Sequence, residues 1–164
     1  MPPFDRIGSL RSFSTRDSPP KVKSVNGEIT AAVLNAAREV HQHFAGRAYS
    51  EENYREAIAN HLRRHGFRVA TLVECVRLDQ YRQIVGHSQA DLVVNDCVVV
   101  LVKVVTRLKA SPSNSKPPVP HEYVQKLRTY MLDGHWSVGL AVVFGPKQYL
   151  YRRLDQPTAT PEGQ

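Results

Sequence analysis

The sequence predicts a single α/β domain in a chain of 164 residues. Three observations predict this class. Two stretches with the apolar spacing of amphipathic helices come first, three strand-like runs follow them, and a further helical stretch precedes another buried strand. The predicted order is α, α, β, β, β, α, β, β, and such a mixture in one short chain is typical of helices packed on a sheet.

Residues 27–44 and 50–67 carry the first two helical patterns. In the second, Ser50 is suited to the N-cap and Gly66 to the C-terminal stop. Glu51 shares a helical stripe with the apolar residues of this segment, so we expect a carboxylate on the core side. The predicted core-facing residues are Ile29, Val33, Ala36, Ala37, Val40 and Phe44 in the first helix, and Tyr54, Ile58 and Leu62 in the second.

Strands are predicted at 67–78, around 90–94 and at 97–105, with turns at Asp79 and at Asn95-Asp96. A proline-rich loop then leads to a predicted helix at 121–132. A buried strand follows at 138–145, and residues 147–154 are expected to add an edge strand.

Composition divides the chain into a domain and two ends. Residues 1–26 are rich in Pro, Ser and Arg without apolar periodicity and predict a flexible basic tail, residues 27–154 form the domain, and residues 155–164 predict a second flexible tail. The RSFST stretch is similar to part of a mitochondrial presequence, but Asp5 and Asp17 argue against that interpretation.

The charge of the chain favours a polyanionic partner. The formal net charge is +7 and the pI is about 9.6, and Lys and Arg bind phosphates by displacing their counterions. No apolar run approaches the ~18 residues of a membrane span. Cys75 and Cys97 both lie in apolar, strand-like runs, which fits thiols in a reducing compartment, so we expect an intracellular protein of the cytoplasm or nucleus.

Lys103 stands alone in the run Cys97–Val105, which is otherwise apolar. A buried ammonium group without a partner is costly. Two interpretations stay open: Lys103 snorkels to water near the edge of the sheet, or it belongs to a functional site.

Several short motifs occur in the same order as in the GxxExxY family of the PD-(D/E)XK nuclease superfamily, which the sequence therefore resembles. They are Val40-His41, AYSEENY at 48–54, DLVVNDCVVVLVK at 91–103 and YMLDGHWSVGLAVVFG at 130–145, although Ala48 replaces the first glycine of the family pattern. The resemblance implies an αβββαβ core around a mixed sheet. It also implies a Mg²⁺ site with Asp91 and Glu51 as ligands and Lys103 as the catalytic lysine.

One departure from the family pattern concerns the chemistry. The resemblance implies a glutamate ten residues after Asp91, and this position holds Leu101. With a three-residue turn at 95–97, Leu101 lies opposite Asp91 on one sheet face, and Lys103 is the next residue on that face. An apolar Leu101 removes a hard ligand from a site that must attract a dication. Lys126 also stands where relatives carry a glutamine, with Gln125 one position away.

Three functions follow as alternatives. The first is a catalytically degenerate nuclease-fold protein that binds nucleic acid or is a basic component of a nucleic-acid-containing assembly. The second is an active Mg²⁺-dependent nuclease with a rearranged ligand set, and the third is a protein-interaction subunit with partners bound through the tails. The residues expected to contact nucleic acid are Arg107, Lys109 and Lys116 after the Lys103 strand, with Arg63 and Arg64 as another surface.

The histidines offer a further, weaker alternative. His61 and His65 have the i, i+4 spacing of two zinc ligands on one helix face. Arg63 and Arg64 lie between them, which is more typical of a solvated basic face.

Overall fold

The protein folds around one mixed sheet in this computed structural model, which describes residues 22–44, 47, 49–108 and 117–156, with only the backbone at 22–25. Two helices come first, three strands follow, and a third helix precedes the last two strands, so the predicted order is confirmed. The elements are α2 (Val22–Phe44), α3 (Glu51–Arg64), β1 (Val69–Leu78), β2 (Ile84–Val94), β3 (Val98–Val104), α4 (His121–Gly134), β4 (Val138–Phe144) and β5 (Tyr149–Asp155).

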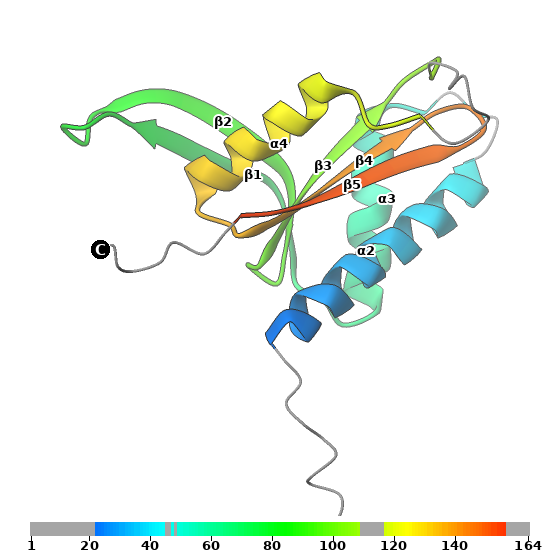
Figure 1. The fold of residues 1–164 in the computed structure, drawn as a ribbon. Coiled ribbons are helices and arrows are strands. Elements are labelled where there is room, and N and C mark those ends of the chain that lie inside the picture. Colours follow the sequence, from blue (N-terminus) through cyan, green and yellow to red (C-terminus); the bar gives the residue numbers. More distant parts are fainter. Residues whose placement is uncertain (1–21, 45–46, 48, 109–116, 157–164) are drawn as a thin grey trace, which may run out of the picture.

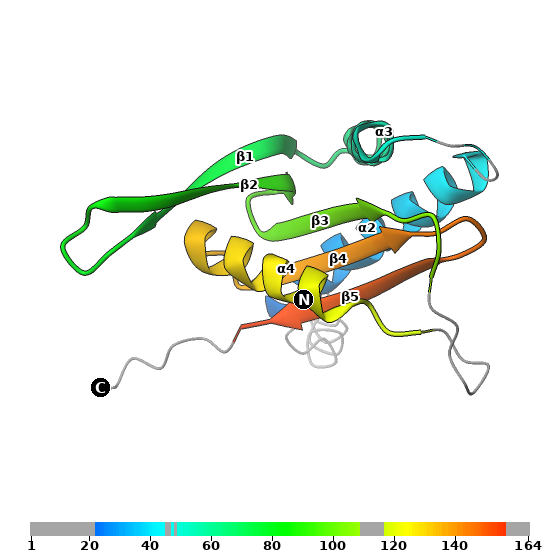
Figure 2. The ribbon, with the colours of Figure 1, turned by 90° about the horizontal axis from the view of Figure 1, so that it is seen from above.

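The sheet has five strands in the order β1-β2-β3-β4-β5. Strands β3 and β4 are parallel, and the other neighbouring pairs are antiparallel. Helix α4 lies on one face of the sheet, and α2 and α3 lie on the other (Figures 1 and 2). The mixed sheet between helices confirms the predicted α/β class.

Each face of the sheet has its own apolar core. The predicted stripes of α2 and α3 are buried against the even-numbered residues of β3, although Phe44 is only half-buried. The odd-numbered residues Val99 and Leu101 face α4 instead, where they pack with Leu127 and Tyr130. Alternate residues of a strand point to opposite faces, so Leu101 and Lys103 are directed toward α4.

The start of α3 is fixed by a capping box, which confirms Ser50 as the N-cap. The Ser50 hydroxyl accepts a hydrogen bond from Asn53 N, and the Asn53 side chain accepts one from Ser50 N. Glu51 therefore occupies the first turn of the helix, beside the end of β3. The helix is followed by Gly66 at φ 91°, a conformation that favours glycine.

The two largest differences from the predicted element boundaries are at the starts of α2 and β2. Helix α2 begins at Val22, before residue 27 where the apolar pattern starts. Strand β2 begins at Ile84, because residues 84–89 pair with β1 in a two-stranded ribbon that projects beyond the rest of the sheet (Figure 2). Exposure of most of this ribbon removes the one-sided apolar alternation that reveals a strand.

None of the helices in the described part of the chain is long and apolar enough to span a membrane.

Candidate functional site

The site lies where β2 separates from β3. Strand β3 pairs with β4 along its whole length, from Val98 to Val104, but its pairing with β2 stops at Leu92 and Val100. Beyond that point β2 continues with β1 only. The next backbone N–H groups on this edge of β3 therefore need acceptors from outside the sheet.

Two carboxylates supply these acceptors. Asp91 Oδ2 accepts a hydrogen bond from Val102 N at 2.8 Å, and Glu51 Oε2 accepts one from Val104 N at 3.2 Å. Asp91 comes from β2 and Glu51 from the first turn of α3, so the opening between the strands is lined by carboxylates from two elements. The structure thus brings together the two acidic residues that the sequence singled out.

The opening coincides with an irregularity in the β1–β2 ladder. Leu72, which is opposite Asp91, has a φ of 53° and forms no strand pair with it, although the positions on either side are paired. Leu92 packs on the α2 and α3 side, whereas Ala90 packs on the α4 side. Residues two apart normally share a face, so the ribbon turns over at Asp91. A left-handed leucine is strained, and here the strain adjoins the site.

Lys103 has a partner. Its Nζ lies 3.6 Å from Glu51 Oε1 and 5.8 Å from the centre of the Tyr123 ring on α4, and its side chain is 21% exposed. The ammonium group is thus held between a carboxylate and an aromatic face, an arrangement that favours a cation. The stem is packed as a snorkelling lysine requires, while the head forms part of the carboxylate site.

Leu101 is buried in the α4-side core. The turn after Val94 has three residues before pairing resumes at Val98, as the prediction assumed. Extending that register by one step places Leu101 opposite Asp91. Its side chain is 0% exposed and belongs to the same apolar cluster as Leu127 and Tyr130. The position where the family pattern has a ligand is therefore filled by ordinary core.

Asp91 lies within electrostatic range of three other charged groups, Glu51, Lys103 and Lys126. Burial raises the pKa of Asp91 above its ordinary range, while the Val102 N–H and the ammonium groups of Lys103 and Lys126 oppose the rise and Glu51 adds to it. Burial, followed by the charge of Asp91, likewise raises the pKa of Tyr130. Two carboxylates thus lie within electrostatic range of two ammonium groups.

Lys126 was noted in the sequence only as the residue that replaces a glutamine, and its place beside the charged site was not predicted. Lys126 Nζ lies 5.9 Å from the centre of the Tyr130 ring. Lys126 and Tyr130 are four residues apart and so share one face of the helix. That spacing was visible in the sequence, but nothing in the sequence showed that Lys126 lies within electrostatic range of Asp91.

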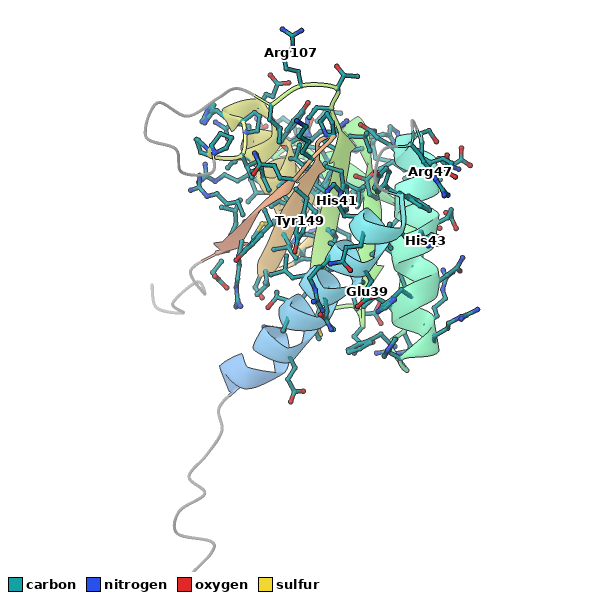
Figure 3. All side chains as sticks on the ribbon, turned by 90° about the vertical axis from the view of Figure 1, so that its right-hand side faces the viewer. Glu39, His41, His43, Arg47, Arg107 and Tyr149 are labelled. Carbon is teal, nitrogen blue, oxygen red and sulfur yellow. The ribbon has the colours of Figure 1, made fainter. Side chains whose placement is uncertain are left out.

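The predicted basic residues fall in different places. Arg107 is exposed on the loop that follows β3 (Figure 3), whereas Lys109 and Lys116 lie outside the described residues. Arg63 and Arg64 are at the opposite end of α3 from Glu51, about 20 Å away by helix rise, and Arg63 donates to Val69 O at 2.9 Å. Of these cations, only Arg107 is described near the Lys103 end of β3.

No group of three or more His, Cys, Asp or Glu suited to a metal ion occurs among residues 22–44, 47, 49–108 and 117–156. His61 and His65 stack with their ring centres 4.4 Å apart, and His65 Nδ1 lies 2.9 Å from His61 O. This ring nitrogen is therefore engaged with the helix backbone, as expected of a solvated basic face.

The mixed sheet, with an aspartate and a lysine on neighbouring strands at the point where they separate, defines a nuclease-type α/β domain. Residues 27–154 match the sequence profile of the PD-(D/E)XK nuclease superfamily. The match covers most of the chain, and the chain belongs to this superfamily.

The chain is similar to the crystal structure of SSO0001, with 14% sequence identity and a TM-score of 0.46 over 66% of this chain. It spans about half the length of that protein, 49%. No curated protein matches the chain significantly.

Proposed function

We propose that this chain is a catalytically degenerate member of its superfamily that binds nucleic acid, alone or as a basic component of a nucleic-acid-containing assembly. The observation that carries the proposal is the complete burial of Leu101 opposite Asp91. We also propose that it belongs to the GxxExxY family, because the motif residues Glu51 and Tyr54 both lie at the start of α3, beside the end of β3.

The donor set fits Mg²⁺ poorly. Asp91 and Glu51 are the carboxylates that would hold the ion, but one oxygen of each already accepts a hydrogen bond from a backbone N–H of β3. Lys103 and Lys126 already offset their negative charge. Hard dications prefer several oxygen ligands with excess negative charge, and Leu101 offers none. The charge balance supports loss of the metal and therefore loss of metal-assisted hydrolysis.

The same features favour binding without cleavage. With the carboxylates neutralised internally, the phosphate backbone meets no net negative charge there. Arg107 adds an exposed cation after β3, and the chain as a whole carries +7. Cationic contacts of this kind give nucleic-acid affinity that falls steeply with salt.

Binding titrations over a series of salt concentrations test this proposal. We expect both DNA and RNA to bind, and Arg107→Gln to weaken binding and lower the salt slope by roughly one. Arg68→Gln is the matched control, since it removes the same charge from an exposed arginine beside the turn at the opposite end of β3. Equal effects of the two substitutions, or no binding by the parent protein, would contradict the proposal.

A second candidate function is protein interaction through the β1–β2 ribbon. Its outer part exposes large apolar side chains: Leu78 (46%), Tyr81 (72%), Ile84 (57%) and Val85 (58%). Contiguous exposed apolar surface is typical of interaction sites. The partner we propose for this surface is a second copy of the chain. Sedimentation analysis of the parent protein and of Ile84→Thr tests for such a dimer. A concentration-dependent dimer that the substitution weakens would support this function.

A further inference from the structure

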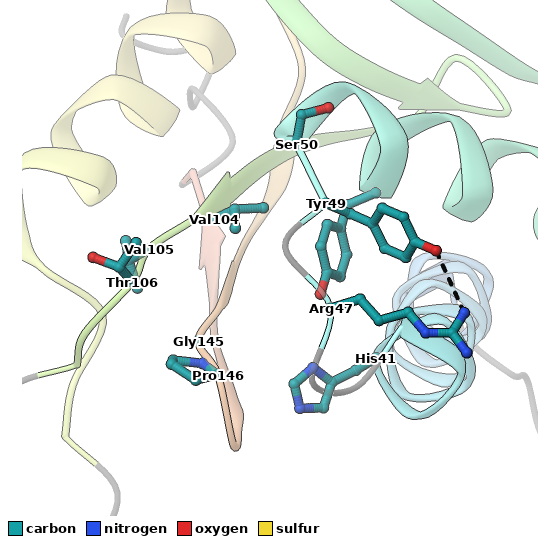
Figure 4. A pocket seen from close by; sticks show the side chains of 10 residues that line it. His41, Arg47, Tyr49, Ser50, Val104, Val105, Thr106, Gly145 and Pro146 are labelled. Atoms are coloured by element: carbon teal, nitrogen blue, oxygen red, sulfur yellow. Dashed lines mark hydrogen bonds between the residues drawn. The ribbon is translucent and has the colours of Figure 1, made fainter.

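A cavity of about 440 Å³ lies beyond the carboxyl ends of the parallel strands β3 and β4 (Figure 4). It is built from four segments: the last turns of α2, the link and first turn of α3, the end of β3, and the turn after β4. Ligands of open α/β sheets bind at the carboxyl ends of strands, and the volume is in the range of ~300–1,000 Å³ found for small-molecule sites.

Three rings line this cavity. Tyr54 is 4% exposed and stacks on Phe144 with ring centres 4.4 Å apart. Tyr49 is half-buried and packs against Phe44 at 4.4 Å, while His41 stacks on Phe144 at 5.9 Å. Ring contacts with Phe44 and Phe144 hold these rings in place, and the half-buried Tyr49 presents a preformed flat surface to an aromatic ligand.

The charge of the lining selects the ligand further. Arg47 is exposed at the rim and donates a hydrogen bond to the Tyr49 hydroxyl at 3.4 Å, and Figure 3 shows it on the same side of the molecule as His41. Of the ten described residues that line the cavity, none is acidic. Aromatic walls beside a guanidinium group suit a flat ring that carries a negative charge nearby.

We propose that this cavity binds the base of one unpaired nucleotide, stacked on Tyr49, with its phosphate at Arg47. The inference rests on the proposed nucleic-acid binding and adds a site and a substrate form to it. A base inside a duplex cannot reach such a cavity without leaving its stack, whereas single-stranded DNA or RNA offers bases freely.

The position of the cavity connects it to the Lys103 site. Val104, which lines it, donates its N–H to Glu51, and Lys103 lies on the opposite face of β3. A single strand that crosses the end of β3 can contact Lys103 and Arg107 with its phosphates and place one base in the cavity. The cavity therefore supplies a preference for single strands that the cations alone do not give.

Fluorescence anisotropy with labelled oligo(dT), oligo(U) and a duplex of the same length tests the proposal. Tyr49→Leu keeps apolar bulk but removes the stacking surface, so we expect about tenfold weaker single-strand binding with duplex binding and the salt slope unchanged. Arg47→Gln should lower the single-strand salt slope by roughly one. Arg68→Gln, at the other end of β3, serves as the control for charge.

Thr106→Trp provides a second variant that leaves the core untouched. Thr106 is exposed at the cavity, so a tryptophan there should block the base without unfolding the protein, which circular dichroism checks. Loss of single-strand binding alone supports the proposal. Equal loss for single strand and duplex, or no loss in any variant, overturns it. If the parent binds neither form, the proposed nucleic-acid binding itself fails.

Discussion

Asp91 Oδ2 accepts the Val102 N–H at 2.8 Å, so a side chain stands on the edge of β3 where β2 would otherwise continue the ladder. Glu51 does the same for Val104 at 3.2 Å. Both carboxylates therefore stabilise the sheet whether or not a metal is bound. The two hydrogen bonds give Asp91 and Glu51 a structural role at this edge of β3.

Two substitutions of Asp91 should distinguish the contribution of its hydrogen bond to stability from the contribution of its charge. Asp91→Ala leaves the Val102 N–H without an acceptor and should lower the free energy of unfolding by about 1–3 kcal/mol. Asp91→Asn keeps an acceptor oxygen and should be clearly more stable than Asp91→Ala. Urea unfolding measures both, and equal stabilities would show that the hydrogen bond contributes nothing.

The raised pKa of Asp91 predicts a pH dependence of stability. Because burial raises this pKa above the unfolded value, the folded state binds more protons than the unfolded state between the two pKa values. Stability then falls as pH rises through that window, which begins at about pH 4. Asp91→Asn removes this contribution. Unfolding free energies across the acidic range should therefore show the parent losing stability relative to the variant as pH rises, and a relative gain would contradict the assignment.

Glu51→Gln should release Lys103 from its ion pair. The amide still accepts from Val104 N, and the pair is partly exposed, so we expect a stability change below about 1 kcal/mol. Removal of a negative charge beside Lys103 should tighten nucleic-acid binding. Glu52→Gln is the matched control, with the same charge change at the next, exposed position of α3. Weaker binding by Glu51→Gln would point to a metal role for Glu51.

Leu101→Glu restores the carboxylate of the family pattern. A buried, unpaired glutamate should destabilise the fold by several kcal/mol, and added Mg²⁺ or Mn²⁺ should recover part of the loss by binding the folded state. Val99→Glu is a control on the same strand face, also 0% exposed but farther from Glu51. Thermal melting with and without metal compares them. Rescue of both variants, or of neither, would show that Asp91 and Glu51 do not form a site that a third ligand completes.

Much of the fold was predictable because its signals are local. Ser50 and Gly66 bound α3, and the turn at Asn95-Asp96 fixes the register that places Leu101 opposite Asp91. Both turn residues have positive φ and Cys97 N donates to Val94 O, which is the arrangement of a type I′ turn. The convergence of Asp91, Glu51 and Lys103 was anticipated only with help from the family resemblance.

The rest depends on contacts between distant segments. The change of face in the β1–β2 ribbon beside Leu72 could not be predicted from the sequence, because leucine is common in regular strands and does not indicate a positive φ. Lys126 lies within electrostatic range of Asp91 because α4 packs on the sheet there, and no local sequence pattern fixes that packing. The cavity near Tyr49 is lined by four segments that are distant in the sequence. Its aromatic residues, taken one at a time, therefore resemble ordinary core residues.

Incubation with Mg²⁺ and several forms of DNA and RNA tests whether the Lys103 site has lost catalysis. The parent protein and Lys103→Ala are compared under conditions where binding is shown in parallel, so that any contaminating nuclease appears equally in both. We expect the parent protein to bind these substrates and to leave them intact. Mg²⁺-dependent cleavage by the parent that Lys103→Ala abolishes would contradict it and would establish an active nuclease with a rearranged ligand set.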